Sequence, residues 1–185
     1  RWADRCIERG EAYSAGMAAM AAWSDAAFMN GYFAHGSLNT GRAVGFTREL
    51  QDAFAALVKV WSLEVDDDSN KIVQNIEAIK RYRRYLKDHT KDEDHFILSD
   101  QQNILLDRKA KRLILKKDYM SLSETLYAEA YWMILVMGKP SIEEHLNSLP
   151  GNLRSMLEGL GFRRMSGVEV MELCSIADDI VRHVM

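Results

Sequence analysis

The stretch FTRELQDAFAALVKVWSLE, residues 46–64, decides the fold class of this chain. Its apolar side chains recur every three or four positions, at Phe46, Leu50, Phe54, Leu57, Val58 and Trp61. This spacing places them on one face of an α-helix, which turns once in about 3.6 residues. A strand would need an apolar residue at every second position instead. We therefore predict an amphipathic helix for this stretch.

Helical spacing also runs through the rest of the chain. The further predicted helices cover residues 70–88, 99–117 and 121–137, a segment from 141, a short segment after 150, and a last segment from 166. Three of them open with a Ser-x-x-Glu capping box, at Ser121, Ser141 and Ser166. No segment shows the two-residue period of a strand. We expect an all-α protein of seven or eight helices.

Length and composition agree with one folded domain. The chain has 185 residues, of which 48% are hydrophobic and 28% are charged, as is usual for globular proteins. We expect one helical-bundle-like domain over residues 1–185. The alternative is a subdivision into an Ala/Gly/Met-rich part, residues 1–65, and a part with the basic and C-terminal helices, residues 66–185.

The N-terminal part contains a long segment with almost no charge. Between Glu11 and Arg42 the only formal charge is Asp25. Its many alanines predict a helix that lets a neighbouring helix approach closely, followed by a turn at Asn30-Gly31 or His35-Gly36. Serine, aspartate and asparagine interrupt the apolar run, and Leu, Ile and Val are absent from residues 12–37. We therefore expect no membrane span.

Positive charge is concentrated in two of the predicted helices, although the net charge is −3. If these helices pack antiparallel, the cations could form one patch that neutralises phosphates, and tyrosines could stack on unpaired bases. The predicted nucleic-acid-binding residues are Lys80, Arg81, Arg83, Arg84, Lys87, Arg108, Lys109, Lys111, Arg112, Lys116 and Lys117, with Tyr82 and Tyr85. The alternatives are a solvated helix face and a face that contacts an acidic protein.

A catalytic interpretation rests on Arg84 and His89. Metal-independent ribonucleases can use such a pair, in which histidine transfers protons and arginine stabilises phosphate charge. We keep it as the third hypothesis, because two residues in a basic segment form a weak signal. No nucleophile or phosphate-loop motif is present.

Metal ligands are also sparse. The pairs Asp92/His95 and Asp179/His183 each supply only two ligands, so we expect no metal and no cofactor. The two cysteines, Cys6 and Cys174, have no zinc-site spacing and indicate reduced thiols in a cytoplasmic protein.

These observations favour a binding function over an enzymatic one. We expect a non-enzymatic helical module that engages nucleic acid or another polyanion through residues 80–87 and 108–117. The alternative is a protein–protein adaptor or structural subunit without nucleic-acid binding. Two segments that are apolar on nearly all sides, one near the N-terminus and one at residues 124–137, predict a homo-oligomer or a partner protein.

Overall fold

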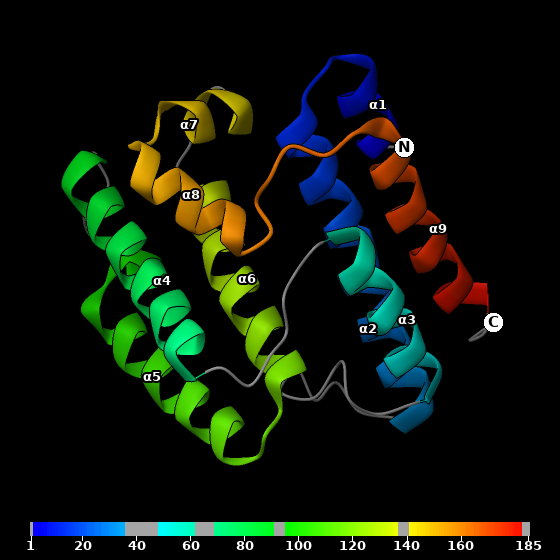
Figure 1. Cartoon of the computed structure of the whole chain (residues 1–185), viewed down its shortest axis with the longest axis horizontal. Coiled ribbons are helices and arrows are strands. Elements are labelled where there is room, and N and C mark those ends of the chain that lie inside the picture. Colours follow the sequence, from blue (N-terminus) through cyan, green and yellow to red (C-terminus); the bar gives the residue numbers. More distant parts are fainter. Residues whose placement is uncertain (1, 36–47, 62–68, 91–94, 137–140, 183–185) are drawn as a thin grey trace. The chain divides into compact units, whose positions relative to one another are not determined.

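The computed structural model describes residues 2–35, 48–61, 69–90, 95–136 and 141–182 (Figure 1). Within these ranges the backbone forms nine α-helices and one short 3₁₀ helix, and no strand. The all-α class is therefore confirmed. The number of helices exceeds the expected seven or eight, partly because a separate short helix, α1 (Trp2–Glu8), begins the chain.

The helices form two compact units. Unit 1 combines Arg1–Glu64 with Gly161–Met185, and unit 2 is Val65–Leu160. The boundary near residue 65 lies where the sequence suggested a subdivision. The last helix, however, packs with the first part of the chain rather than with the middle part.

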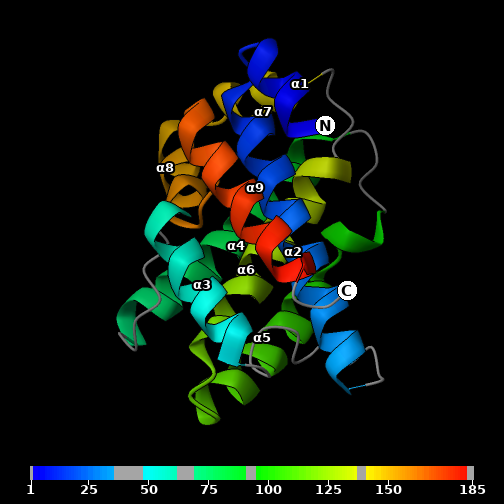
Figure 2. The same cartoon turned by 90° about the vertical axis from the view of Figure 1, so that its right-hand side faces the viewer.

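Unit 1 is built around α2 (Ala12–His35), which packs against α1 and α9 (Gly167–Arg182). Figure 2 shows α9 running beside α2, with α3 (Arg48–Trp61) next to it. The predicted amphipathic helix is thus confirmed as α3, whose buried side chains include Leu50, Phe54, Leu57 and Trp61. The first residue of its predicted stripe, Phe46, lies outside the described residues.

Small residues explain the close packing of α2. Every residue from Tyr13 to Met20 is buried, and half of them are alanine or glycine. A Cβ atom on Gly16 would lie only 2.8 Å from the sulfur of Met165, so a side chain at this position would force the Met165 side chain to move. The helix continues through Asn30 and Gly31 to His35. Of the two predicted turns, the one at Asn30-Gly31 is therefore wrong, and the one at His35-Gly36 extends outside the described residues.

Unit 2 is centred on α6 (Tyr119–Val136), which packs against α4 (Ser69–His89), α5 (Asp100–Leu115) and α7 (Ile142–Ser148). The remaining helix, α8 (Gly151–Gly159), packs against α4. A 3₁₀ turn at Phe96–Leu98 leads into α5. None of the described helices is both long enough and apolar enough to cross a membrane.

The caps of unit 2 agree only partly with the sequence. Ser141 accepts a hydrogen bond from the Glu144 N–H at 3.0 Å, so the cap predicted for α7 is confirmed. The cap predicted at Ser121 is wrong, because α6 already begins at Tyr119. Asp118 accepts from the Ser121 N–H at 3.1 Å instead. Aspartate is as good a cap as serine, so both positions fitted the sequence.

Candidate binding surface

Two ion pairs join α4 to α5 and set their direction. Lys80 Nζ lies 2.8 Å from Asp107 Oδ1, and Lys87 Nζ lies 3.6 Å from Asp100 Oδ2. Since residue numbers rise along α4 where they fall along α5, the two helices are antiparallel. Residues 80–87 therefore lie beside 100–107, and the second basic group, 108–117, lies beyond Lys80. The two basic groups occupy different ends of the helix pair and do not lie side by side.

Two of the predicted nucleic-acid-binding residues lie in the core. Arg83 is 1% exposed, and its Nε donates to Ile97 O at 2.9 Å. Its other nitrogens bind the Asn103 amide oxygen and the Glu129 carboxylate. Burial lowers the Arg83 pKa, and Glu129 opposes this change. Because a buried guanidinium with a complete set of partners cannot contact a phosphate, Arg83 belongs to the core of unit 2.

Tyr82 is also buried. Its hydroxyl shares a 2.6 Å hydrogen bond with His145 Nε2, and burial raises its pKa well above the usual value. Tyr85 is half-buried and stacks on His89, with ring centroids 4.1 Å apart. The buried Tyr82 ring therefore offers no face on which an unpaired base could stack, and His89 already covers one face of the Tyr85 ring.

Lys109 points toward α6 rather than outward. It is half-buried, and burial lowers its pKa against the opposing charges of Glu129 and Glu124. Glu124 is half-buried as well. Burial raises the Glu124 pKa to about 7, Lys109 lowers it, and Asp118 raises it further. This charged group therefore belongs to the contact between α5 and α6.

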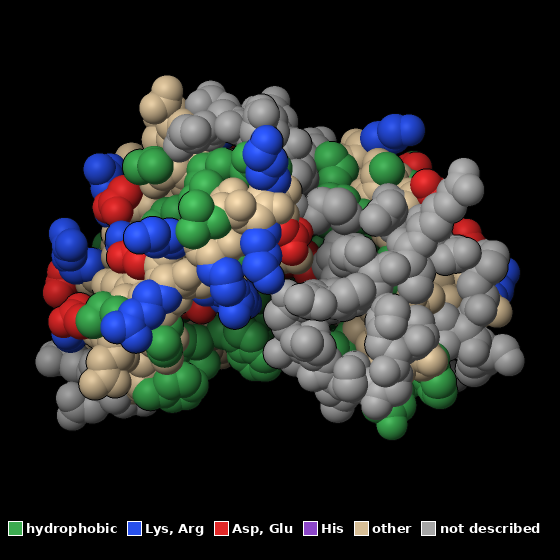
Figure 3. Space-filling view, turned by 90° about the horizontal axis from the view of Figure 1, so that it is seen from below, with side chains coloured by type: hydrophobic (Ala, Val, Ile, Leu, Met, Phe, Trp, Pro, Cys, Tyr) green, Lys and Arg blue, Asp and Glu red, His purple; other side chains and the backbone are tan. Residues whose placement is uncertain are grey.

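Among the predicted nucleic-acid-binding residues, the exposed cations lie mainly on and just after α5. They are Arg81 and Arg84 on α4, and Arg108, Lys111, Arg112, Lys116 and Lys117 on or after α5. Lys80 and Lys87 are partly buried and form ion pairs with Asp107 and Asp100, respectively. In Figure 3, the surface over α4 and α5 shows Lys and Arg side chains mixed with hydrophobic and acidic ones.

The outer side of α5 also carries apolar side chains. Ile104, Leu105 and Leu115 are 52%, 54% and 76% exposed. Arg108, Lys111 and Arg112 lie between them on the same side of the helix, and together these six residues are called the α5 face. The apolar members of this face were not predicted from the sequence, although a signal was present. Leu106, Ala110 and Leu113 alone make the buried stripe, so Ile104, Leu105 and Leu115 must lie elsewhere on the helix.

Arg84 and His89 do not form a single site within this chain. Both are exposed on α4, which continues unbroken through His89. Five residues of an α-helix place them about 140° apart around its axis. His89 Nδ1 also lies 2.8 Å from Tyr85 O, within hydrogen-bonding distance. The geometry within one chain therefore does not bring the predicted ribonuclease pair onto one phosphate.

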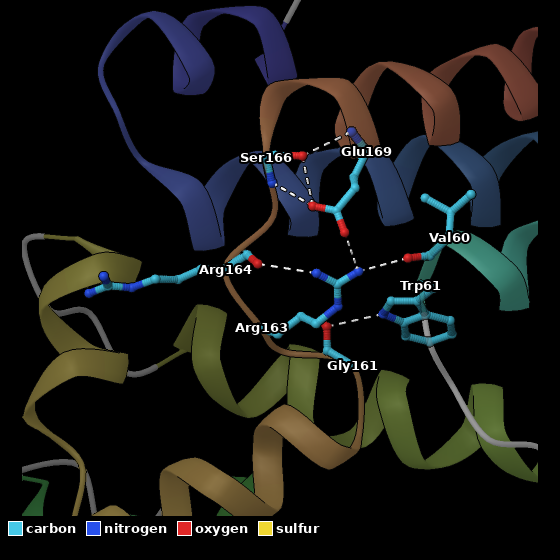
Figure 4. Close-up of polar contacts among 7 residues, drawn as sticks. All are labelled: Val60, Trp61, Gly161, Arg163, Arg164, Ser166 and Glu169. Atoms are coloured by element: carbon cyan, nitrogen blue, oxygen red, sulfur yellow. Dashed lines mark hydrogen bonds and ion pairs between the residues drawn. The ribbon is translucent and has the colours of Figure 1, made fainter.

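Unit 1 contains a polar cluster that has a structural explanation (Figure 4). Arg163 donates to Val60 O and to Glu169, both at 2.7 Å. Glu169 also accepts from the N–H and hydroxyl of Ser166, which confirms the predicted capping box of α9. These bonds, first Arg163 and then Ser166, lower the Glu169 pKa to about 2. The cluster joins the end of α3 to the start of α9.

A groove of about 320 Å³ also lies in unit 1, lined mainly by aliphatic side chains such as Leu50, Ile176 and Ile180. Across the described ranges, no group of three or more His, Cys, Asp or Glu side chains could hold a metal ion. Asp92 and His183, from the two weighed pairs, lie outside those ranges. No protein-family model matches the chain, and comparisons with curated proteins and with solved structures each found no match.

Proposed function

We propose that this protein is a non-enzymatic helical binding module whose α5 face engages an acidic partner protein. The proposal rests mainly on one observation: exposed Arg108, Lys111 and Arg112 lie on one side of α5 between exposed Ile104, Leu105 and Leu115. When a partner covers exposed aliphatic side chains, the free energy of the complex falls. Arginines among them select a partner with carboxylates at matching positions.

An acidic protein fits this surface better than nucleic acid does. Tyr82 and Arg83 are buried, and Lys80 and Lys87 already hold carboxylates. A phosphate backbone would gain little from Leu115 and Ile104, whereas an amphipathic protein helix would bury them. The reduced thiols Cys6 and Cys174 support a cytoplasmic location for such a module.

Fluorescence anisotropy with three labelled probes tests this proposal. The first is a designed helical peptide with Leu and Glu on one face. The second is the same peptide with Ser in place of each Leu, and the third is a single-stranded RNA of equal charge. We expect the Leu/Glu peptide to bind at least about tenfold more tightly than the Ser peptide, because each buried leucine adds apolar contact. Binding should weaken as salt rises from about 50 to about 200 mM.

Two double variants locate the binding surface. Arg108→Glu with Arg112→Glu should abolish peptide binding, whereas Arg81→Glu with Arg84→Glu should leave it unchanged. Both pairs are exposed arginines on unit 2, so they change net charge equally. If RNA binds as tightly as the peptide, or if no probe binds at low salt, the proposal is wrong.

A further inference from the structure

The outer side of α9 carries a pattern opposite to that of the α5 face. Val168 is 78% exposed and Met171 53%. Glu172 and Asp178 are exposed on the same side of the helix. These four residues are called the α9 face. The opposite side of α9 is buried through Val170, Leu173, Ala177 and Ile180, which pack within unit 1. In Figure 2, α9 lies on the side of unit 1 toward the viewer.

The two faces match in length and in order. Ile104 to Leu115 spans about 16 Å along α5, and Val168 to Asp178 spans about 15 Å along α9. When the helices are placed antiparallel, Leu115 lies opposite Met171 and Val168. Arg108 then lies opposite Asp178, and Lys111 and Arg112 lie near Glu172. Leu115 meets apolar side chains, and cations meet carboxylates.

A parallel arrangement fits less well. If Ile104 lay opposite Val168, Arg108 would still reach Glu172. Leu115, the most exposed apolar side chain of the α5 face, would then lie opposite Asp179, and Asp178 would have no cation opposite it. Burying an aliphatic group against a carboxylate removes water from the charge without supplying a partner. The antiparallel arrangement instead places cations opposite both Asp178 and Glu172.

We propose that the partner bound by the α5 face is a second copy of this chain, through its α9 face. This inference rests on the proposed function, because both use the α5 face. Contact between the apolar residues supplies the attraction, and the charge pairs set the direction and register of the helices. One helix face on each side makes a small interface, so we expect association in the micromolar range.

Sedimentation velocity with charge-reversed variants tests the inference. One variant carries Arg108→Glu with Arg112→Glu, and the other carries Glu172→Lys with Asp178→Lys. Wild type should associate as its concentration rises from about 1 to about 200 μM. Each variant alone should stay monomeric, since the substituted positions would face like charges in a second copy.

Mixing the two variants should restore association, because each contact in the mixture then pairs opposite charges. A chain with all four substitutions should also associate with itself. All four positions are exposed, so circular dichroism should show the wild-type helix content in every variant. Recovery in the mixture would be hard to explain by any surface other than these two.

Failure of this inference can be told apart from failure of the proposed function. If wild type stays monomeric at the highest concentration while the Leu/Glu peptide still binds, the second copy is not the partner and the proposed function stands. The inference is also wrong if the mixture of variants stays monomeric while wild type associates. If neither peptide binding nor association occurs, the proposed function itself is wrong.

Discussion

Lys80 Nζ lies 2.8 Å from Asp107 Oδ1, and this contact fixes which part of α5 lies beside which part of α4. Together with the pair of Lys87 and Asp100, it directs two cations of α4 toward acidic partners within unit 2. The outer side of α5 is left with Arg108, Lys111 and Arg112 beside exposed aliphatic side chains. The register of the helix pair therefore determines the chemistry of the α5 face.

The neighbouring arginines Arg83 and Arg84 should differ strongly in their effect on stability. Arg83→Met leaves the Glu129 carboxylate without its buried partner, and such losses cost about 3–5 kcal/mol. Arg84 is exposed, so Arg84→Met should change the free energy of unfolding by less than about 0.5 kcal/mol. Urea unfolding of both variants measures the difference. Equal effects would contradict the burial of Arg83.

Gly161 should tolerate no side chain. Its φ is +98°, and a Cβ atom there would lie 2.2 Å from Trp61 Nε1, which donates to Gly161 O at 3.0 Å. We expect Gly161→Ala to lower the free energy of unfolding by about 2–4 kcal/mol. Gly159→Ala is the matched control, since nothing lies within 4 Å of its Cβ position. A mild effect at Gly161 would show that Trp61 does not pack there.

Glu124 should make stability fall as pH rises. Burial holds its pKa at about 7 in the folded chain, against a usual value of 4.5. The stability that neutral Glu124 contributes is therefore fully present below about pH 4.5 and is lost as pH rises through about 7. Glu124→Gln stays neutral, so it should be more stable than wild type at about pH 8 and differ less at about pH 5. Unfolding midpoints at both pH values check this.

Glu169 provides the control of opposite sign. Its pKa is lowered to about 2, so its contribution is present above the usual value of 4.5 and is lost as pH falls through about 2. Glu169→Gln should therefore be less stable than wild type at both test pH values. If Glu124→Gln behaved in the same way, the assigned pKa of Glu124 would be wrong.

Two serines should respond oppositely to alanine. The Ser121 hydroxyl is buried with no hydrogen-bond partner among the described residues, so Ser121→Ala should leave stability unchanged or raise it by about 1 kcal/mol. The Ser141 hydroxyl caps α7, so Ser141→Ala should lower the free energy of unfolding by about 1 kcal/mol. Thermal unfolding of the two variants separates these outcomes. If Ser121→Ala lost as much stability as Ser141→Ala, the Ser121 hydroxyl would have to form a hydrogen bond.

Much of the fold could be predicted from local pattern. The apolar period placed α3 and α9, and serine with glutamate placed the starts of α7 and α9. The burial of Tyr82 and Arg83 was also within reach, because the stripe of Ile72, Ile76 and Ile79 continues onto them at helical spacing. Both residues were predicted on the surface because the segment is rich in positive charge, and this prediction was wrong.

Other features depend on contacts between distant residues. Arg83 can be buried only because Asn103 and Glu129 reach it from α5 and α6, and no local pattern reveals such partners. The return of α9 to the first part of the chain is set by the fit of α2 and α9. The position of the α5 face beside α4 likewise depends on the register of the two helices, which the ion pairs of Lys80 and Lys87 set.

Photocrosslinking tests the central claim most directly. A benzoylphenylalanine at position 115 should crosslink two copies of the chain, and mass spectrometry should find the attachment within residues 168–182. The same group at the exposed position 152 of α8 is the control and should give no such product. Crosslinks from position 115 that never reach α9 of another copy, or no crosslinks at concentrations where wild type associates, would contradict the pairing of these two faces.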